Sequence, residues 1–256
     1  MADTVLAAQL YTIRDFMKTP ADLAESLKKV KEIGYDAVQL SGHGEIDDKE
    51  LKKYCDDAGL IVCATHVSFD MLENETEKAV EFHKLLDCSN VAIGGMPGDY
   101  RGSGEGFKKF AEAATVVGQK LAEHGLRFGY HNHSFELRKF DGTTGLDILY
   151  DNSDPKYVMA EIDTYWVQHG GGSPEAWLRK LKGRVPFIHL KDMVMTEETP
   201  QMFAEIGEGN LDWDGILKAG QECDVEWYIV EQDRCDRDPF EALKISLDNL
   251  KAMGLS

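Results

Sequence analysis

The feature that most constrains the fold is a repeated order of amphipathic helix, glycine or turn, and short apolar run. Residues 20–34, PADLAESLKKVKEIG, place Leu23, Leu27 and Val30 at helical spacing, and Gly34 suits the left-handed conformation that ends a helix. The apolar run YDAVQLSG follows at once and indicates a buried strand. The same order recurs along the chain and, with VLAAQLYT, YVMAEIDTYW and EWYIVEQD as further strands, predicts eight strand–helix units.

Eight such units without a change in composition predict an α/β fold, a single (β/α)8 TIM barrel in which residues 1–256 form one domain. Parallel strands need helical crossovers, and right-handed crossovers close the sheet. An open, doubly wound sheet is disfavoured because no strand is followed by a GxGxxG or GxxxxGKS/T phosphate-binding motif. In a barrel, the functional groups are expected at the carboxyl ends of the strands.

Local signals place several of the expected helices. Pro20, Pro174 and Pro239 each follow Thr, Ser or Asp, an order that predicts a helix start. The helical patterns at residues 145–150 and 212–222 are the weakest.

Charge and composition limit the partners. The formal net charge of −18 repels phosphate backbones and anionic lipid, so we expect no nucleic-acid or membrane partner. No stretch reaches the roughly 18 uninterrupted apolar residues of a membrane span, and MADTVLAAQL lacks the features of a secretory signal. A cytoplasmic location is therefore expected. The five cysteines form no CxxC pair and leave one over, which indicates reduced packing residues.

Metal-type ligands gather at the ends of four successive predicted strands. Alternation along each strand would turn His131, Asp163, His189 and Glu231 toward the same interior. Two imidazoles and two carboxylates suit one Mn, Zn, Co or Fe ion better than calcium. A lone histidine at a strand end is usually only a hydrogen-bonded residue, so the prediction depends on the set. Glu161 is expected lower in the barrel, as a second carboxylate or a partner of an arginine.

The sequence resembles the xylose isomerase-like TIM-barrel superfamily, the sugar phosphate isomerase/epimerase group, over nearly its whole length. The motifs that carry the resemblance are AAQLYTIRD, VQLSGHG, ATHVSFDML, FGYHNHSFEL, EIDTYW, FIHLKD, IGEGNLDW and VEQD. In most of that superfamily, a Glu–Asp–His–Glu set holds a divalent metal, and the resemblance implies Asp163, His189 and Glu231 for three ligands. His131 stands where the superfamily usually has the first Glu, with His133 or Glu136 as the alternative fourth ligand.

Parts of the chain are also similar to the inosose dehydratases. The similar stretches are Tyr130–His133, Ile162–Thr164, His189–Asp192, Gly207–Gly209 and Glu231–Asp233. Trp166 departs from this pattern, because related proteins often have His there.

The polar strand ends suggest substrate contacts. The resemblance implies a polyol-binding role for six residues at the ends of the first three strands: Gln9, Tyr11, Gln39, Ser41, His43 and His66. Trp166 could stack on a sugar or serve as a core lid. In the Gly-rich loop GGMPGDYRGSGEG, Arg101 could bind a phosphate, although a mobile surface loop is an equal alternative.

The chemistry predicted for this set is proton abstraction next to a carbonyl, because a divalent cation stabilises the enediolate while a nearby base moves the proton. The candidate acids and bases are Glu231, Glu136, His133 and Lys191.

Four function classes follow from these observations. We expect first a metal-dependent sugar or sugar-phosphate isomerase/epimerase, and second a lyase on a keto-inositol or 3-keto-glycoside. A DNA-repair enzyme of the endonuclease-four type shares the fold, but it needs more histidines and a basic surface. A non-catalytic binding barrel is the fourth class, and it would bind no metal. A small-molecule sugar or polyol is the expected partner, and a homo-oligomer is compatible with the sequence.

Overall fold

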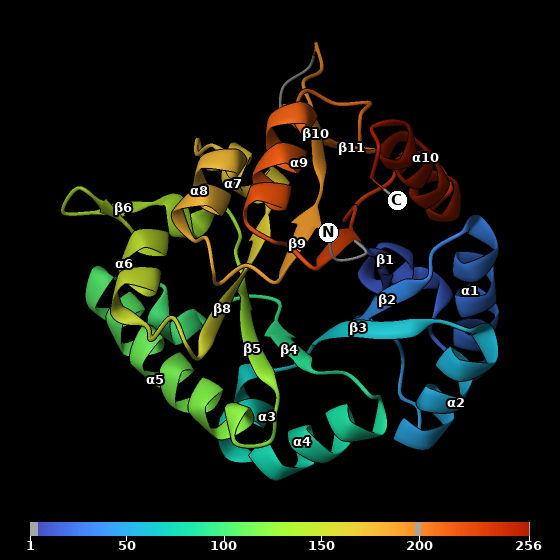
Figure 1. Ribbon diagram of the computed structural model, residues 1–256, viewed down its shortest axis with the longest axis horizontal. Helices are drawn as coiled ribbons and strands as arrows, with labels where there is room; N and C mark the ends of the chain where they lie inside the picture. The colour runs from blue at the N-terminus through green and yellow to red at the C-terminus, as the bar shows by residue number, and fades with distance from the viewer. Residues whose placement is uncertain (1–4, 198–200, 256) are drawn as a thin grey trace.

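Eight parallel strands close into a barrel in the computed structural model, which describes residues 5–197 and 201–255. The order around the barrel is β1-β12-β9-β8-β5-β4-β3-β2, so neighbours in sequence are neighbours in space and the last strand pairs with the first (Figure 1). The predicted TIM barrel is confirmed. The barrel strands are β1 (Val5–Gln9), β2 (Ala37–Leu40), β3 (Ile61–His66), β4 (Asn90–Ile93), β5 (Arg127–His131), β8 (Val158–Asp163), β9 (Phe187–Leu190) and β12 (Trp227–Val230).

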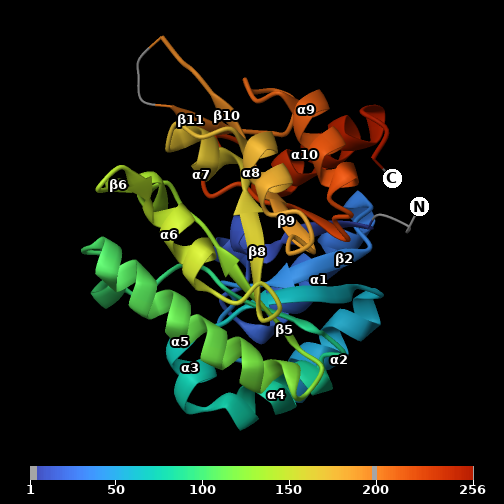
Figure 2. The ribbon, with the colours of Figure 1, turned by 60° about the vertical axis from the view of Figure 1, so that its left-hand side comes forward.

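Helices surround the barrel and cover the outer face of its strands (Figures 1 and 2). Both weak helical patterns are confirmed, as α6 (Gly145–Asn152) and α9 (Trp213–Glu222). Each of the three prolines is the first residue of a helix, and the side chain of the residue before it accepts a backbone N–H of that helix. The predicted helices are α1 (Pro20–Ile33), α2 (Asp48–Ala58), α4 (Thr76–Leu85), α5 (Gly104–Ala122), α6 (Gly145–Asn152), α8 (Pro174–Lys180), α9 (Trp213–Glu222) and α10 (Pro239–Ala252).

The barrel interior is narrow and is filled mainly by small side chains. Ala7, Ala37 and Ala64 pack there against Phe187 and Ile229. Gly129 of β5 faces the same space, and a Cβ at this position would overlap the Phe187 ring. Because side chains alternate along a strand, the residue two positions after each of these also faces the interior. It lies closer to the carboxyl end of the barrel.

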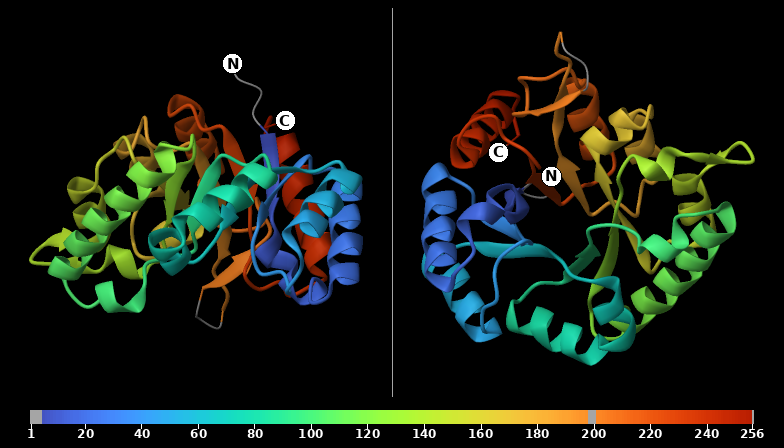
Figure 3. Two further views of the ribbon diagram at one scale, coloured as in Figure 1. Left: turned by 90° about the horizontal axis from the view of Figure 1, so that it is seen from below. Right: turned by 180° about the vertical axis from the view of Figure 1, so that it is seen from behind.

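Several short elements were not predicted from the sequence. They are α3 (Phe69–Asn74), α7 (Thr164–His169), three short 3₁₀ segments, η1 (Leu10–Phe16), η2 (Gly98–Tyr100) and η3 (Phe135–Leu137), and two hairpins, β6 (Lys139–Phe140) with β7 (Thr143–Thr144) and β10 (Asp192–Val194) with β11 (Met202–Ala204). The β10–β11 hairpin extends away from the ring of helices (Figures 2 and 3).

The start of α7 corrects the predicted sixth strand. We expected a strand through EIDTYW, but β8 ends at Asp163 and Trp166 lies on α7. The Asp163 side chain accepts the Trp166 backbone N–H, so the residue at the strand end also caps a helix.

Two further expectations concern the rest of the chain. All five cysteines are free and four of them are buried, as expected for packing residues. Within residues 5–197 and 201–255, no helix combines the length and the apolar character that a membrane crossing requires.

Candidate metal-binding active site

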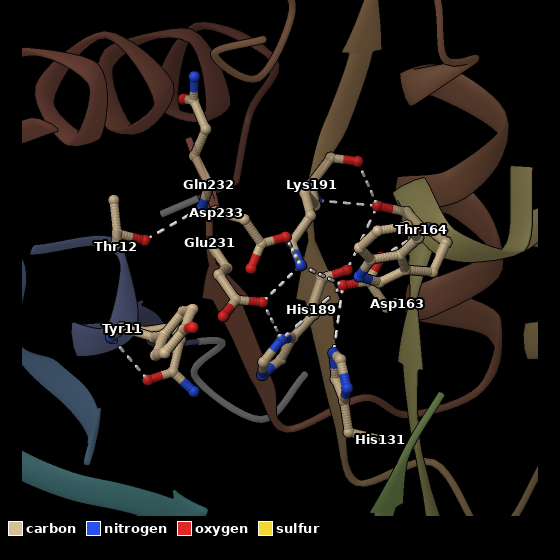
Figure 4. A network of polar contacts seen from close by, with 12 residues as sticks. Tyr11, Thr12, His131, Asp163, Thr164, His189, Lys191, Glu231, Gln232 and Asp233 are labelled. Atoms are coloured by element: carbon tan, nitrogen blue, oxygen red, sulfur yellow. Dashed lines mark hydrogen bonds and ion pairs between the residues drawn. The ribbon is translucent and has the colours of Figure 1, made fainter. Parts of the chain in front are cut away.

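Four potential metal ligands converge at the carboxyl ends of four adjacent strands, as predicted. His131 ends β5, Asp163 ends β8, His189 lies in β9, and Glu231 directly follows β12. The parallel register places Asp163 opposite His189. All four side chains are buried, and one potential ligand atom from each lies within 4.8 Å of the others (Figure 4).

The spacing of these atoms fits one divalent cation. Nε2 of His131 lies 3.2 Å from Oδ2 of Asp163, and Nδ1 of His189 lies 2.9 Å from Oε2 of Glu231. Bonds of about 2.0–2.2 Å to one ion would place ligand atoms about 3 to 4.4 Å apart. Only a small contraction of the cluster is therefore needed. Nδ1 of His131 is buried and has no hydrogen-bond partner within residues 5–197 and 201–255.

Two hydrogen bonds fix Asp163, and its second carboxylate oxygen faces the cluster. Its Oδ1 caps α7 by accepting the Trp166 N–H at 2.8 Å, and its backbone N–H donates to Oδ1 of Asn132 at 3.1 Å. The middle residue of the His131–His133 stretch thus ties the end of β5 to the end of β8. Oδ2 of Asp163 remains directed at His131 and Lys191.

Amide side chains hold the other face of His189. Its Nε2 lies 2.6 Å from Oε1 of Gln39, which also accepts from Nε2 of Gln9 at 2.8 Å. Gln39 then donates to Glu161 at 2.7 Å. Both glutamines are fully buried beneath the cluster, where Gln39 contacts His189 and Gln9 contacts Gln39. The substrate contacts expected of both stay a prediction.

Glu161 lies lower in the barrel, as one of the two alternatives predicted, and no arginine in the described part of the chain pairs with it. Its Oε2 lies 2.6 Å from Nε2 of His66, and its Oε1 lies 3.1 Å from Nε2 of His189. These three residues form a second group with metal-ligand spacing. Since both oxygens of Glu161 already accept hydrogen bonds, we interpret this group as a polar network that supports the cluster above it.

Lys191 brings a buried ammonium into the cluster. Its Nζ lies 2.9 Å from Oδ2 of Asp163, 2.6 Å from Oε2 of Glu231 and 3.0 Å from Oδ2 of Asp233. The Thr164 hydroxyl accepts the Lys191 backbone N–H and donates to its carbonyl, which fixes the chain just beyond β9. Figure 4 shows the lysine tip directed at the three carboxylates.

The charges in this cluster depend on one another. Burial opposes ionisation of Asp163 and Glu231, but Lys191, together with the neighbouring histidines, outweighs it and holds the pKa of each below its usual value. Burial also opposes protonation of His189, but Glu161 and Glu231 raise its pKa to about 10. In the metal-free protein, His189 and Lys191 are therefore cations between anionic carboxylates.

His133 forms an aromatic wall beside the cluster, together with Trp166 of α7. The His133 ring centroid lies 5.0 Å from that of His131 and 5.3 Å from that of Trp166. Burial and the neighbouring His131 lower the pKa of His133 to about 3, so its ring is neutral at pH 7. Nδ1 of His133 and Nε1 of Trp166 have no hydrogen-bond partner among the residues that the structure describes. This wall offers stacking and hydrogen bonds more readily than a base.

Glu136, a predicted acid or base, lies outside the cluster. Its fully buried carboxylate accepts from the Tyr130 hydroxyl at 2.6 Å and from the His133 backbone N–H at 3.0 Å. Burial raises its pKa to about 7, although these hydrogen bonds oppose that rise. The contacts assign it to holding the loop that carries His133.

The remaining predicted substrate contacts lie around the mouth of the barrel. His43 and His66 line one cavity of about 270 Å³ at the ends of β2 and β3, and Ser41 follows β2. Tyr11 is 37% exposed. Arg101 is exposed, donates to the Met96 carbonyl and lies over the Phe135 ring at 4.4 Å.

Asp192 organises the loop after β11, a role that the sequence analysis missed. Its Oδ2 accepts the backbone N–H of Gly207 at 2.9 Å and of Gly209 at 3.1 Å, and the Trp213 indole N–H at 2.7 Å. A Cβ at Gly209 would overlap this carboxylate. The predicted Gly-x-Gly loop therefore wraps a buried side chain of the protein itself.

A closed (β/α)8 barrel with two imidazoles and two carboxylates at its strand ends defines the class: a TIM-barrel protein with a candidate divalent-metal centre. A family model described as xylose isomerase-like TIM barrel matches residues 27–253, and the chain belongs to this family. The resemblance inferred from the motifs is confirmed.

Known proteins of two descriptions are similar to the chain. It is 22% identical over 297 residues to inosose dehydratase from Mesomycoplasma hyopneumoniae, covering 97% of this chain and 95% of the relative. It is 28% identical over 161 residues to inosose dehydratase from Clostridium beijerinckii, where the match spans about half of each protein, 56% and 53%. A crystal structure of a sugar phosphate isomerase/epimerase from Parabacteroides distasonis shares the fold, with a TM-score of 0.82 and 23% identity over 98% of this chain and 95% of that one.

Proposed function

We propose that this protein is a divalent-metal-dependent enzyme that removes a proton from the carbon next to a carbonyl group of a sugar or polyol. The buried group of His131, Asp163, His189 and Glu231, with Lys191 in contact with two of its carboxylates, is the observation that supports this proposal. These four residues would hold the cation. When bound, it would supply Lewis-acid stabilisation of the negative charge that develops on the carbonyl oxygen.

Glu231 and Lys191 are the acid–base pair that we assign to the proton transfers. Glu231 is ionised, and no residue in 5–197 or 201–255 is hydrogen-bonded to its Oε1, so this oxygen is available as a base. Lys191 carries its proton 2.6 Å from the other oxygen of the same carboxylate. A base and an acid thus stand side by side in a buried site.

A β-elimination uses such a pair directly, and we favour it as the outcome. Glu231 takes the proton from carbon, the electrons of the C–H bond form a C=C bond, and the C–O bond at the next carbon breaks. Lys191 protonates the departing oxygen, which leaves as water or an alcohol. The similarity to inosose dehydratases over nearly the whole chain supports this lyase reading, with a keto-inositol or 3-keto-glycoside as the substrate class.

An isomerase remains the second candidate, because one observation favours it too. Nζ of Lys191 lies 2.6 Å from Oε2 of Glu231, so the two groups act on the same face of the substrate. They can return the abstracted proton to the neighbouring carbon. That transfer converts a ketose to an aldose without an acid on the opposite face. Epimerisation needs such an opposite acid, and the neutral His133 is a weak one.

Substrate binding is assigned to the aromatic wall and the cavity beside it. Trp166 would stack on the apolar face of a sugar, while Nδ1 of His133 and Nε1 of Trp166 would bond to its hydroxyls. His43 and His66 would contact the part of the substrate that enters the neighbouring cavity.

Incubation with keto-inositols, 3-keto-glycosides and ketoses in heavy water tests the reaction. A lyase yields a product lighter by water or an alcohol, whereas an isomerase incorporates deuterium into a product of unchanged formula. We expect either result only with Mn or Co present and not with Glu231→Gln. Turnover without metal, or cleavage of abasic DNA, contradicts the proposal.

Elemental analysis tests the metal site separately from activity. Protein loaded with Mn or Co should retain about one equivalent, whereas Asp163→Ala and His189→Ala should not. His131→Ala shows whether His131 is the fourth ligand. His124→Ala, an exposed histidine just beyond α5, is the matched control. Equal retention by all variants contradicts the site, whereas no retention by the wild-type protein favours the non-catalytic barrel.

A further inference from the structure

We propose that a subsite for an anionic group of the substrate lies beside the candidate metal centre; this inference rests on the proposed function. The subsite is a cavity of about 260 Å³ between η1, which follows β1, and the loop that follows β12. Its lining includes Thr12, Arg14, Asp233, Arg234 and Arg237. Three guanidinium groups around one small cavity contrast with the overall charge of −18.

Arg14 is held in place by contacts that leave its charge unneutralised. Its Nη1 donates to the Tyr11 carbonyl and its Nη2 to the Asp233 carbonyl, each at 2.9 Å. The guanidinium lies 4.2 Å from the centre of the Tyr11 ring. Neutral carbonyls fix the side chain without supplying a counterion, so Arg14 is pre-organised to bind an anion.

The carboxylates that line the cavity are already paired with other cations. Asp15 lies 3.1 Å from Lys18, and Asp233 lies 3.0 Å from Lys191. Arg237 is itself paired with Glu205 at 3.0 Å.

Arg14 and Arg234 have no carboxylate within ion-pair distance among residues 5–197 and 201–255. Two of the three arginines therefore lack a counterion. An oxyanion in the cavity would supply it.

The cavity adjoins the reacting groups through a single residue. Arg14 binds the backbone carbonyl of Asp233, while the Asp233 carboxylate contacts Lys191. The Gln232 backbone N–H donates to Thr12 at 3.0 Å, which joins the loops on the two sides of the cavity (Figure 4). A substrate whose reacting carbon lies at Glu231 would extend past Asp233 to the arginines.

Arg101, for which the sequence predicts a phosphate contact, is not part of this subsite. That side chain follows β4, three strands from β1 around the barrel, and it is held by the Met96 carbonyl and the Phe135 ring. Planar guanidinium groups bind phosphoryl and carboxylate oxygens with paired N–H donors. The subsite therefore fits a sugar phosphate or a sugar acid better than a neutral sugar.

Binding of inorganic phosphate to the metal-loaded and the chelator-treated protein tests the subsite. We expect phosphate binding in both forms, and tighter binding of glucose 6-phosphate than of glucose. Glucuronate in parallel shows whether a carboxylate serves as well. Arg234→Gln should weaken phosphate binding at least fivefold, and within residues 5–197 and 201–255 it removes no hydrogen bond or ion pair of the side chain. Arg14→Gln should do the same, and Arg138→Gln, an exposed arginine over Phe140, should change nothing.

Phosphate affinity of wild-type strength in the Arg14→Gln/Arg234→Gln double variant overturns the subsite, as does a loss confined to Arg101→Gln. The proposed function fails separately, through loss of metal retention or of exchange on neutral keto-sugars. Both arginine variants should retain one equivalent of metal, so a failure of one proposal is distinguishable from a failure of the other.

Discussion

The ammonium of Lys191 lies 2.6 Å from Oε2 of Glu231, the oxygen that also faces Nδ1 of His189 at 2.9 Å. A fixed positive charge thus contacts an oxygen that a metal ion would use. Lys191 therefore affects two separate properties: the affinity of the site for the metal ion and the stability of the metal-free protein.

Replacing Lys191 by Met should therefore have opposite effects on these two properties. Cobalt affinity should rise at least tenfold, because a cation that competes for Asp163 and Glu231 is removed. The metal-free protein should lose about 3–5 kcal/mol, since buried carboxylates lose their partner. Metal titration and urea unfolding with and without cobalt measure both effects, with the exposed Lys108→Met as control. Unchanged cobalt affinity would contradict the competition.

Metal binding should release about one proton at pH 7. Because the pKa of His189 is raised to about 10, its ring is protonated before binding and must lose a proton to become a ligand, whereas Asp163 and Glu231 are already ionised. Apparent affinity should therefore rise close to tenfold for each pH unit between 6 and 9. Calorimetry in two buffers with different ionisation enthalpies counts the proton. No release would mean that His189 is neutral in the metal-free protein.

Two substitutions at Asp163 separate its two roles. Asp163→Asn can still accept the Trp166 N–H that begins α7, whereas Asp163→Ala cannot and should lose about 1 kcal/mol more stability. Both should weaken metal binding strongly, since neither supplies a charged ligand. Thermal unfolding in chelator and metal retention provide the comparison. Equal stability of the two variants would show that the cap contributes little.

His83 should make stability depend on pH for a reason unrelated to the site. Its buried ring lies between the Thr65 hydroxyl and the Ala79 carbonyl, and burial lowers its pKa below the usual 6.5. The unfolded chain therefore binds a proton more readily, so this contribution is complete above pH 6.5 and is lost as the pH falls. The stability difference between wild type and His83→Gln should shrink from pH 7.5 to pH 5 in urea unfolding. A constant difference would rule this out.

Gly129→Ala should destabilise the barrel by about 1–3 kcal/mol, because its new methyl group meets the Phe187 ring inside a closed sheet. Adding Phe187→Leu should restore part of the loss. Gly102→Ala, in open space on a surface loop, is the control for the glycine change alone. Chemical unfolding of the wild type, the two single variants, the double variant and the control decides the matter, and additive losses in the double variant would show that the two residues do not compete for one space.

Much of the fold and the cluster could be predicted from periodicity. Regular helix–strand alternation defines a barrel almost completely, and a period of two fixes which residues face inward. His131, Asp163, His189 and Glu231 were therefore predictable as a set once four strands were placed.

The network under the cluster could not be predicted in the same way. Gln9 and Gln39 resemble substrate contacts because both follow a strand pattern to its end, and only the packing of the strands shows that Gln39 meets His189 and Gln9 meets Gln39 below the mouth. The prediction that Trp166 lies in a strand was wrong for a local reason. Asp163 can end a strand and cap a helix at once, and no periodic signal distinguishes that from a longer strand.

The carboxylate of Asp192 and the bare Cα of Gly209 occupy adjoining space in the loop beside Lys191. In evolutionary terms, neither residue can change alone: a side chain at 209 would expel the carboxylate, and loss of the carboxylate would leave backbone N–H groups of the loop without their acceptor. Descendants of this sequence should therefore keep both or replace both, and a lineage that loses Asp192 should also show a rebuilt segment from Gly207 to Leu211.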